Sequence, residues 1–89
     1  MKQRIWVAAV DHRHGTDLYA AQTEDGLYAQ LAAYCTRDWR DAFPDEDIPP
    51  HDLDDQGIVA AYFEAMGNGG DEWLVCQDVE IEISEPVPA

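Results

Sequence analysis

The second half of the chain constrains the fold most, because it is strongly acidic and still contains the residues of a core. Residues 41–89 hold fourteen Asp and Glu and no Lys or Arg, whereas five acidic and five basic residues cancel in 1–40. The same half includes Trp73, Val75, Val79 and Ile81. A disordered acidic tail contains few aromatic and β-branched residues. We therefore expect an anionic surface carried by a folded protein.

Length and composition predict one small domain over residues 1–89. A chain of 89 residues with 46% hydrophobic residues can build a single core. The opening segment is too short, and too soon followed by Asp11, His12 and Arg13, to be a secretory signal. No apolar run reaches the roughly 18 residues of a membrane span. We expect a protein of the bacterial cytoplasm that makes no membrane contact.

The first part of the chain predicts a β-hairpin. Residues 4–10 form a short apolar run with β-branched and aromatic members, which favours a strand. Residues 11–15 provide the turn, and 16–22 are long enough to return as a second strand.

Two amphipathic helices are predicted next. Thr23 is a suitable N-cap for the first, which should run to Asp41 or Ala42. Its apolar stripe recurs at three- and four-residue spacing and consists of Tyr28, Leu31, Ala32, Cys35 and Trp39. Asp52 or Asp54 is expected to cap the second helix after a proline-rich acidic loop. Its buried face consists of Ile58, Val59, Tyr62, Phe63 and Met66, and the glycines of 67–70 end it.

Residues 72–83 alternate and predict the longest strand. We expect one side of it to face the interior, namely Trp73, Val75, Gln77, Val79, Ile81 and Ile83. The other side carries Leu74, Cys76, Asp78, Glu80 and Glu82. The predicted fold is α+β: a two-layer β-β-α-α-β arrangement in which two helices cover a three-stranded antiparallel sheet. The order of the strands stays open.

The aromatic residues and cysteines are mainly assigned to the core. Trp39 and Trp73 are predicted core residues, whereas Trp6 is open to a core or an interface position. Tyr28, Tyr34 and Tyr62 are assigned to the core as well, although Tyr34 lies off the main stripe, which leaves an exposed position as its alternative. Cys35 and Cys76 are too few for a disulfide framework and are expected to be free.

The acidic residues of the last strand form a carboxylate ladder. Residues two apart on one face of a strand are separated by about 6.6 Å, so Asp78, Glu80 and Glu82 are regularly spaced. Successive phosphates of a nucleic-acid strand have a similar spacing. The ladder can therefore occupy Lys and Arg pockets built for a nucleic-acid backbone.

A second acidic group lies between the predicted helices, and we call it the loop cluster. It consists of Asp41, Asp45, Glu46, Asp47, Asp52, Asp54 and Asp55. Whether the loop cluster and the ladder share one side of the protein stays open. With five cations in all and none beyond Arg40, direct binding of nucleic acid is not expected.

No metal, cofactor or catalytic site is predicted. His12 and His14 could contribute to a metal site, but zinc patterns need paired ligands at each end. An enzyme could use Cys35 as a nucleophile, or the pair Asp54 and Asp55 for acid and base chemistry. Cys35 lies on an apolar stripe, and so short a chain seldom encloses a substrate pocket beside its core.

The short length, the acid-rich α+β pattern and the lack of a catalytic motif resemble the small anti-CRISPR and anti-restriction proteins of phages and plasmids. That resemblance implies a non-enzymatic inhibitor that occupies the basic nucleic-acid-binding surface of a defence complex or nuclease. The residues expected to contact such a partner are Asp78, Glu80, Glu82, Asp45, Glu46, Asp47, Asp54 and Asp55.

Two alternatives stay open. The chain could be an accessory or structural module that forms a homodimer, or pairs with another protein, through apolar surface or an edge strand. Such contact should be nearly insensitive to salt. The acidic surface could also be only solvated, with no partner at all.

Overall fold

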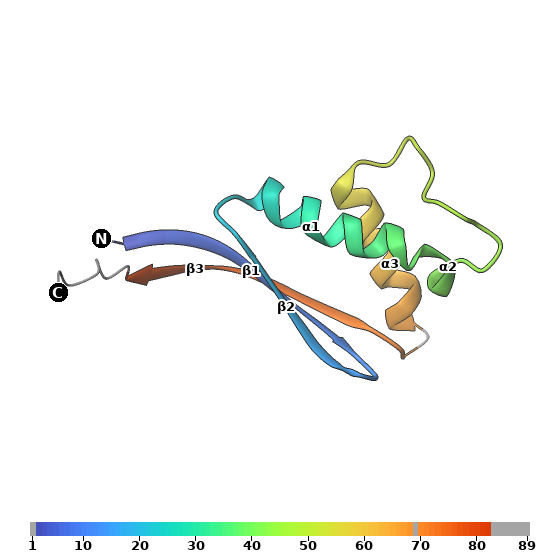
Figure 1. Cartoon of the computed structure of the whole chain (residues 1–89), viewed down its shortest axis with the longest axis horizontal. Coiled ribbons are helices and arrows are strands. Elements are labelled where there is room, and N and C mark those ends of the chain that lie inside the picture. The colour runs from blue at the N-terminus through green and yellow to red at the C-terminus, as the bar shows by residue number, and fades with distance from the viewer. Residues whose placement is uncertain (1, 69, 83–89) are drawn as a thin grey trace, which may run out of the picture.

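The computed structural model describes residues 2–68 and 70–82 and has the predicted α+β class. The elements in chain order are β1 (Lys2–His12), β2 (Gly15–Ala21), α1 (Glu24–Arg37), α2 (Trp39–Ala42), α3 (Asp55–Asn68) and β3 (Trp73–Glu82). Figure 1 shows the helices gathered on one side of a long, twisted sheet.

The sheet is antiparallel, with the strand order β2-β1-β3. The hairpin pairs Ala9 of β1 with Leu18 of β2, and on its other edge Ala9 pairs with Val75 of β3. The first and last strands are therefore neighbours. The hairpin turn needs glycine at Gly15, because its φ of 133° lies in a region that other residues rarely adopt.

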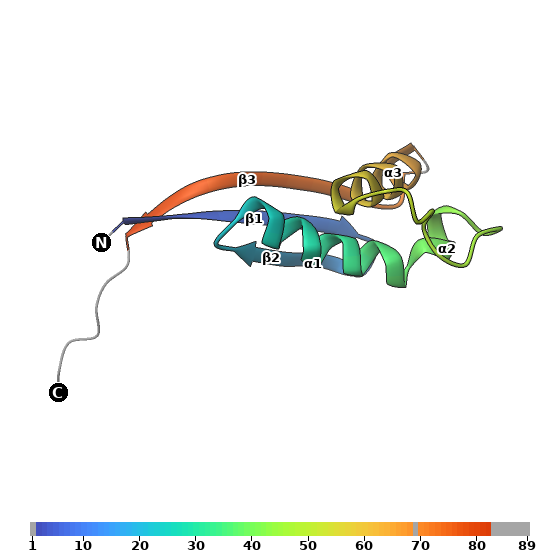
Figure 2. The same ribbon diagram turned by 90° about the horizontal axis from the view of Figure 1, so that it is seen from above.

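The helices cover only part of one sheet face. In both views the start of β1 and the end of β3 extend past the helices (Figures 1 and 2). The core lies under the helices, where Ala8 and Val10 of the sheet meet the apolar faces of the three helices. The helical core residues are Leu27, Leu31, Ala32, Tyr34, Cys35, Trp39, Val59, Tyr62 and Met66.

Both long helices begin at the predicted type of cap. The Thr23 hydroxyl accepts a hydrogen bond from the backbone N–H of Gly26 at 3.0 Å. Asp54 plays the same part for α3, accepting from the N–H of Gly57 at 2.7 Å. Each side chain satisfies a backbone donor that has no partner within the helix. Of the two predicted caps for α3, Asp54 is therefore the one used.

The prediction of one helix up to residue 41 or 42 is wrong in one respect, because the helix breaks at Asp38. Asp38 has φ −104° and ψ 19°, and α2 follows it as a separate short turn. After the break Trp39 is buried and lies 6.4 Å from Tyr62 of α3, measured between ring centroids, and 4.6 Å from Phe43, which follows α2. Burial of Trp39 against α3 thus outweighs continuation of the helix.

The predicted inward face of β3 is also wrong. Val10 is buried under the helices and pairs with Leu74, so Leu74 packs against the core while Trp73 and Val75 face away. Trp73 is 53% exposed and Val75 is 62% exposed. The alternation was predicted correctly, but in a strand a shift of one residue exchanges the two faces. Ile83, assigned to the same face, lies outside the described residues.

The other aromatic predictions have mixed outcomes. Trp39 and Tyr62 are buried as predicted, with 1% and 0% exposure. Tyr34 is buried too, so its exposed alternative is wrong. Trp6 and Tyr28 are partly buried and pack against the edge of the core. Both cysteines are free, with Cys35 buried and Cys76 exposed.

Candidate functional site

The carboxylate ladder lies on the helix side of the sheet, at the end that the helices do not reach. Asp78 forms an ion pair with Arg4 of the neighbouring strand. The register places Glu80 opposite Arg4 and Glu82 opposite Lys2. Cross-strand neighbours of opposite charge attract each other. The ladder is therefore a mixed-charge surface of three carboxylates and two cations.

The loop cluster is different, because all seven of its residues are exposed. Asp47 pairs with Arg40, and Glu46 accepts a hydrogen bond from the indole N–H of Trp39 at 3.3 Å. Asp54 is used as the cap of α3. Four members of the loop cluster, Asp41, Asp45, Asp52 and Asp55, have no hydrogen-bond or ion-pair partner for their carboxylates among residues 2–68 and 70–82.

The two acidic groups do not form one continuous surface. The end of β3, which carries the ladder, lies at one end of the molecule, and the loop between α2 and α3 lies at the other end in both views (Figures 1 and 2). The question left open by the sequence is thus answered by the arrangement in space, because the end of β3 extends away from the helices.

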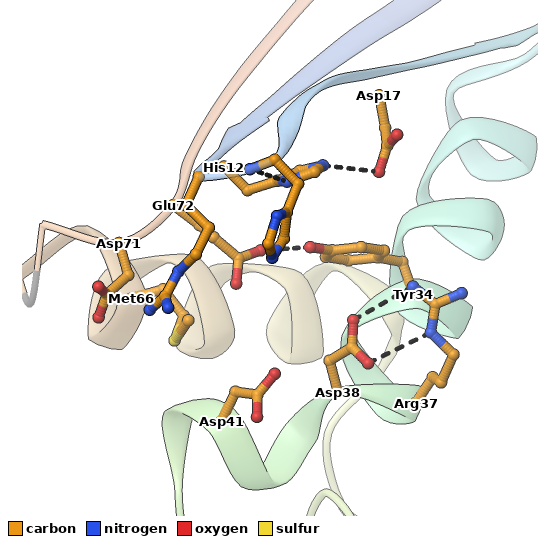
Figure 3. A pocket seen from close by; sticks show the side chains of 11 residues that line it. His12, Asp17, Tyr34, Arg37, Asp38, Asp41, Met66, Asp71 and Glu72 are labelled. Carbon is orange, nitrogen blue, oxygen red and sulfur yellow. Dashed lines mark hydrogen bonds and ion pairs between the residues drawn. The ribbon is translucent and has the colours of Figure 1, made fainter.

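A polar cavity of about 510 Å³ lies where the hairpin turn approaches the helices (Figure 3). Two pairs of its polar lining side chains are in contact, His12 with Asp17 and Arg37 with Asp38. Nε2 of His12 lies 3.1 Å from Oδ2 of Asp17. Arg37 donates two hydrogen bonds to Asp38, at 3.1 and 3.3 Å, and its guanidinium lies 5.1 Å from the centre of the Tyr34 ring.

Glu72 lines this cavity and is buried, with 7% exposure. Its two carboxylate oxygens accept hydrogen bonds from the hydroxyls of Tyr34 and, at 2.9 Å, Tyr62 (Figure 3 shows the first). The pKa of both tyrosines is raised well above its usual value. Burial is the largest cause, and the hydrogen bond to Glu72 is the second. These bonds connect α1, α3 and the start of β3.

Sequence reasoning missed the role of Glu72. The residue follows Gly70 and Asp71 directly and precedes an apolar strand, so the chain itself gives no reason to bury it. Its tyrosine partners are 38 and 10 residues away. Only the packing of α1 and α3 on the sheet brings the three side chains together.

The residues weighed for metal binding or catalysis have other contacts. Nδ1 of His12 accepts a hydrogen bond from the backbone N–H of His14 at 3.2 Å. Within the described part of the chain no three His, Cys, Asp or Glu side chains are grouped to hold a metal ion. Burial raises the pKa of Cys35 to about 12, so little of this fully buried thiol is thiolate at neutral pH.

The sheet face turned away from the helices is apolar, and we call it the open sheet face. Its residues are Gln3, Ile5, Val7, Ala9, Asp11, Thr16, Leu18, Ala20, Trp73, Val75, Gln77, Val79 and Ile81. Asp11 is the one charged residue among them. Leu18 is 79% exposed, and a groove of about 480 Å³ runs over the face beside it. Sequence reasoning missed this surface because it assigned the apolar side of β3 to the interior.

Comparison with protein-family models, with characterised proteins and with solved structures gives no match for this chain. Across residues 2–68 and 70–82, no helix has the length and apolar character needed to cross a membrane. Function therefore has to be inferred from the surfaces themselves.

Proposed function

We propose that the chain is a non-enzymatic inhibitor that docks its loop cluster onto the basic nucleic-acid-binding surface of another protein. The partner class is a CRISPR effector or a restriction enzyme in the cytoplasm of a bacterial host. One observation carries the proposal: seven exposed carboxylates surround the loop between α2 and α3, and four of them have no partner among the described residues.

The physical basis is electrostatic. Clustered like charges raise the free energy of the isolated protein, and a complementary basic surface relieves that repulsion. Exposed ion pairs contribute little one at a time, so a cluster is needed to give affinity. Such a cluster also accelerates encounter with a basic channel, and the effect decreases when salt shortens the screening length to about 10 Å or less.

The loop cluster supports this proposal more strongly than the ladder does, because the charges of the ladder are partly offset. Lys2 and Arg4 face the ladder and offset two of its three charges. Asp78, Glu80 and Glu82 therefore contribute less to binding than Asp45, Glu46, Asp47, Asp54 and Asp55. Asp47 and Asp54 also have structural partners, so a clean test uses the partnerless members of the cluster.

The test reverses three partnerless charges of the loop cluster, Asp45→Lys, Asp52→Lys and Asp55→Lys. The tagged protein is used to capture partners from a bacterial lysate at low salt, and the captured proteins are identified. We expect a nucleic-acid-binding protein that the reversed variant captures at least about tenfold less. Purified, that protein should lose its DNA or RNA binding when the wild-type chain is added at low salt, and keep it when the reversed variant is added instead.

The matched control is Asp25→Lys, Glu64→Lys and Asp71→Lys, which changes the net charge equally outside the loop cluster and the ladder. Asp25 lies in the first turn of α1, as Asp55 does in α3, so the cost to each helix is similar. We expect the control to keep most of its binding. Equal loss in both variants, or capture of no nucleic-acid-binding protein at low salt, would overturn the proposal.

A further inference from the structure

The apolar and charged residues of β3 lie on the opposite faces from those expected for a single folded chain. In an antiparallel sheet with one solvated face, apolar residues turn toward the core and charged residues toward water. Here the helix side carries Asp78, Glu80 and Glu82, and the side facing solvent carries Trp73, Val75, Val79 and Ile81. This arrangement indicates that another molecule covers the open sheet face.

The lack of charge on the open sheet face indicates which kind of molecule covers it. The chain has a net charge of −14, yet the open sheet face holds only Asp11, at one end of β1. A basic partner finds its counter-charges on the loop cluster and almost none on this face. A second copy of the chain, by contrast, brings an equally neutral apolar face.

The shape of the open sheet face also fits a second copy. In one cross-strand row a small residue, Ala9, lies between two larger ones, Leu18 and Val75. Leu18 and Val75 therefore stand as ridges beside a groove over Ala9. A two-fold contact needs one surface that supplies both ridge and groove. Stacked sheets interdigitate in this way at about 10 Å separation.

The size of the face is sufficient for a dimer of modest affinity. Strands of eleven, seven and ten residues cover a flat area of roughly 400 Å² per copy at standard strand spacing. The accessible surface of the protruding side chains is larger. Two such faces amount to roughly 800 Å² of flat area, and the side chains add to it, which is the size of a weak specific interface below about 1,200 Å².

We propose that two copies of this chain stack through their open sheet faces and form a homodimer. The helices and both loop clusters lie on the outside of this sandwich, so the dimer presents two acidic surfaces. The proposal does not depend on the identity or existence of a basic partner.

Sedimentation equilibrium of the full chain at low and high salt, about 0.05 M and 0.5 M NaCl, tests the proposal. We expect a species of twice the 10.0 kDa chain mass, with the dimer fraction rising with concentration. Because each copy carries a charge of −14, screening should strengthen the dimer as salt increases. Binding of a basic partner has the opposite salt dependence, so the failures of the two proposals are distinguishable.

Two variants locate the interface, Leu18→Glu and Val75→Glu. Each side chain is more than half exposed in the single chain, so neither change disturbs the core. We expect each to weaken the dimer at least about tenfold, because it buries an unpaired carboxylate. Ile48→Glu is the control, since Ile48 is an equally exposed apolar residue, at 70%, away from the sheet.

The control should leave the dissociation constant unchanged within about twofold, with the same circular dichroism for all variants. A chain that stays monomeric at every concentration and salt would overturn the proposal and leave a different protein as the occupant. A dimer that survives both Leu18→Glu and Val75→Glu would overturn it as well, because the contact would then use a sheet edge or another surface.

Discussion

The two faces of the sheet differ in a way that hydrophobicity alone does not predict. Under the helices Ala8 and Val10 of the sheet are buried, and Leu74 packs against the core. On the open sheet face Leu18 and Trp73 are just as apolar, yet they are 79% and 53% exposed among the described residues. An apolar strand face therefore indicates burial, but does not say which molecule covers it.

The helix side of the sheet is itself divided into two parts. Near the helices it is packed against the core, whereas its far end carries Lys2 and Arg4 opposite the acidic ladder. At this end the side chains of β1 and β3 pair with each other, and no helix of the described residues packs over them. The acids of this end are therefore partly neutralised, and those of the loop cluster are not.

The largest expected contrast is between two leucines, Leu31 and Leu18, which are 0% and 79% exposed. Leu31→Ala should lower the free energy of unfolding by about 2 to 5 kcal/mol, because it leaves a cavity in the core. Leu18→Ala should change the stability of the single chain by no more than about 0.5 kcal/mol. Urea unfolding measured at several protein concentrations checks both values.

The dependence on protein concentration separates the two leucines further. The Leu31→Ala effect should not depend on protein concentration, whereas any Leu18→Ala effect should grow with it, because a dimer is stabilised by mass action. Similar, concentration-independent losses for the two leucines would show that the open sheet face is covered by the chain itself.

The next largest effect concerns Glu72 on the helix side. Glu72→Ala leaves the buried hydroxyls of Tyr34 and Tyr62 without their acceptor and should cost about 1 to 3 kcal/mol. Glu72→Gln keeps one acceptor oxygen and should cost less. Asp71→Ala is the control, since Asp71 is the exposed neighbour. Thermal unfolding of the three variants measures the differences, and equal values for Ala at 71 and 72 would contradict the role of Glu72.

The smallest effect is expected at the far end of the sheet. Arg4 and Asp78 have side chains that are 62% and 39% exposed, so their ion pair is well hydrated. A double-mutant cycle with Arg4→Ala and Asp78→Ala should give a coupling of less than about 1 kcal/mol, decreasing with salt. A coupling several times larger would mean that this end of the sheet is shielded from solvent, as in a closer contact between copies than we infer.

Much of the fold could be predicted from local pattern. The hairpin, the caps at Thr23 and Asp54 and the stripes of both long helices depend on residues a few positions apart, so the chain displays them directly. The break at Asp38 was not visible, because it depends on where Trp39 meets the rings of Phe43 and Tyr62. Exposure of the loop cluster followed from its prolines and charges.

The pairing of the acidic ladder could not be predicted, because Arg4 and Asp78 are 74 residues apart. The same holds for Glu72 and Tyr34, which meet only after the helices pack on the sheet. In each case the partner is chosen by strand order and helix placement. The charge or hydrophobicity of a side chain indicates that it will have a partner, but does not identify that partner.

By itself the sequence determined that this protein is an α+β fold with an acidic second half, because periodicity, caps and charge are local properties of the chain. Only the tertiary structure decided which face of β3 the helices cover and which acids receive a cation. The register between β1 and β3 fixes both at once. In a strand, one step of register exchanges every side chain between the two faces.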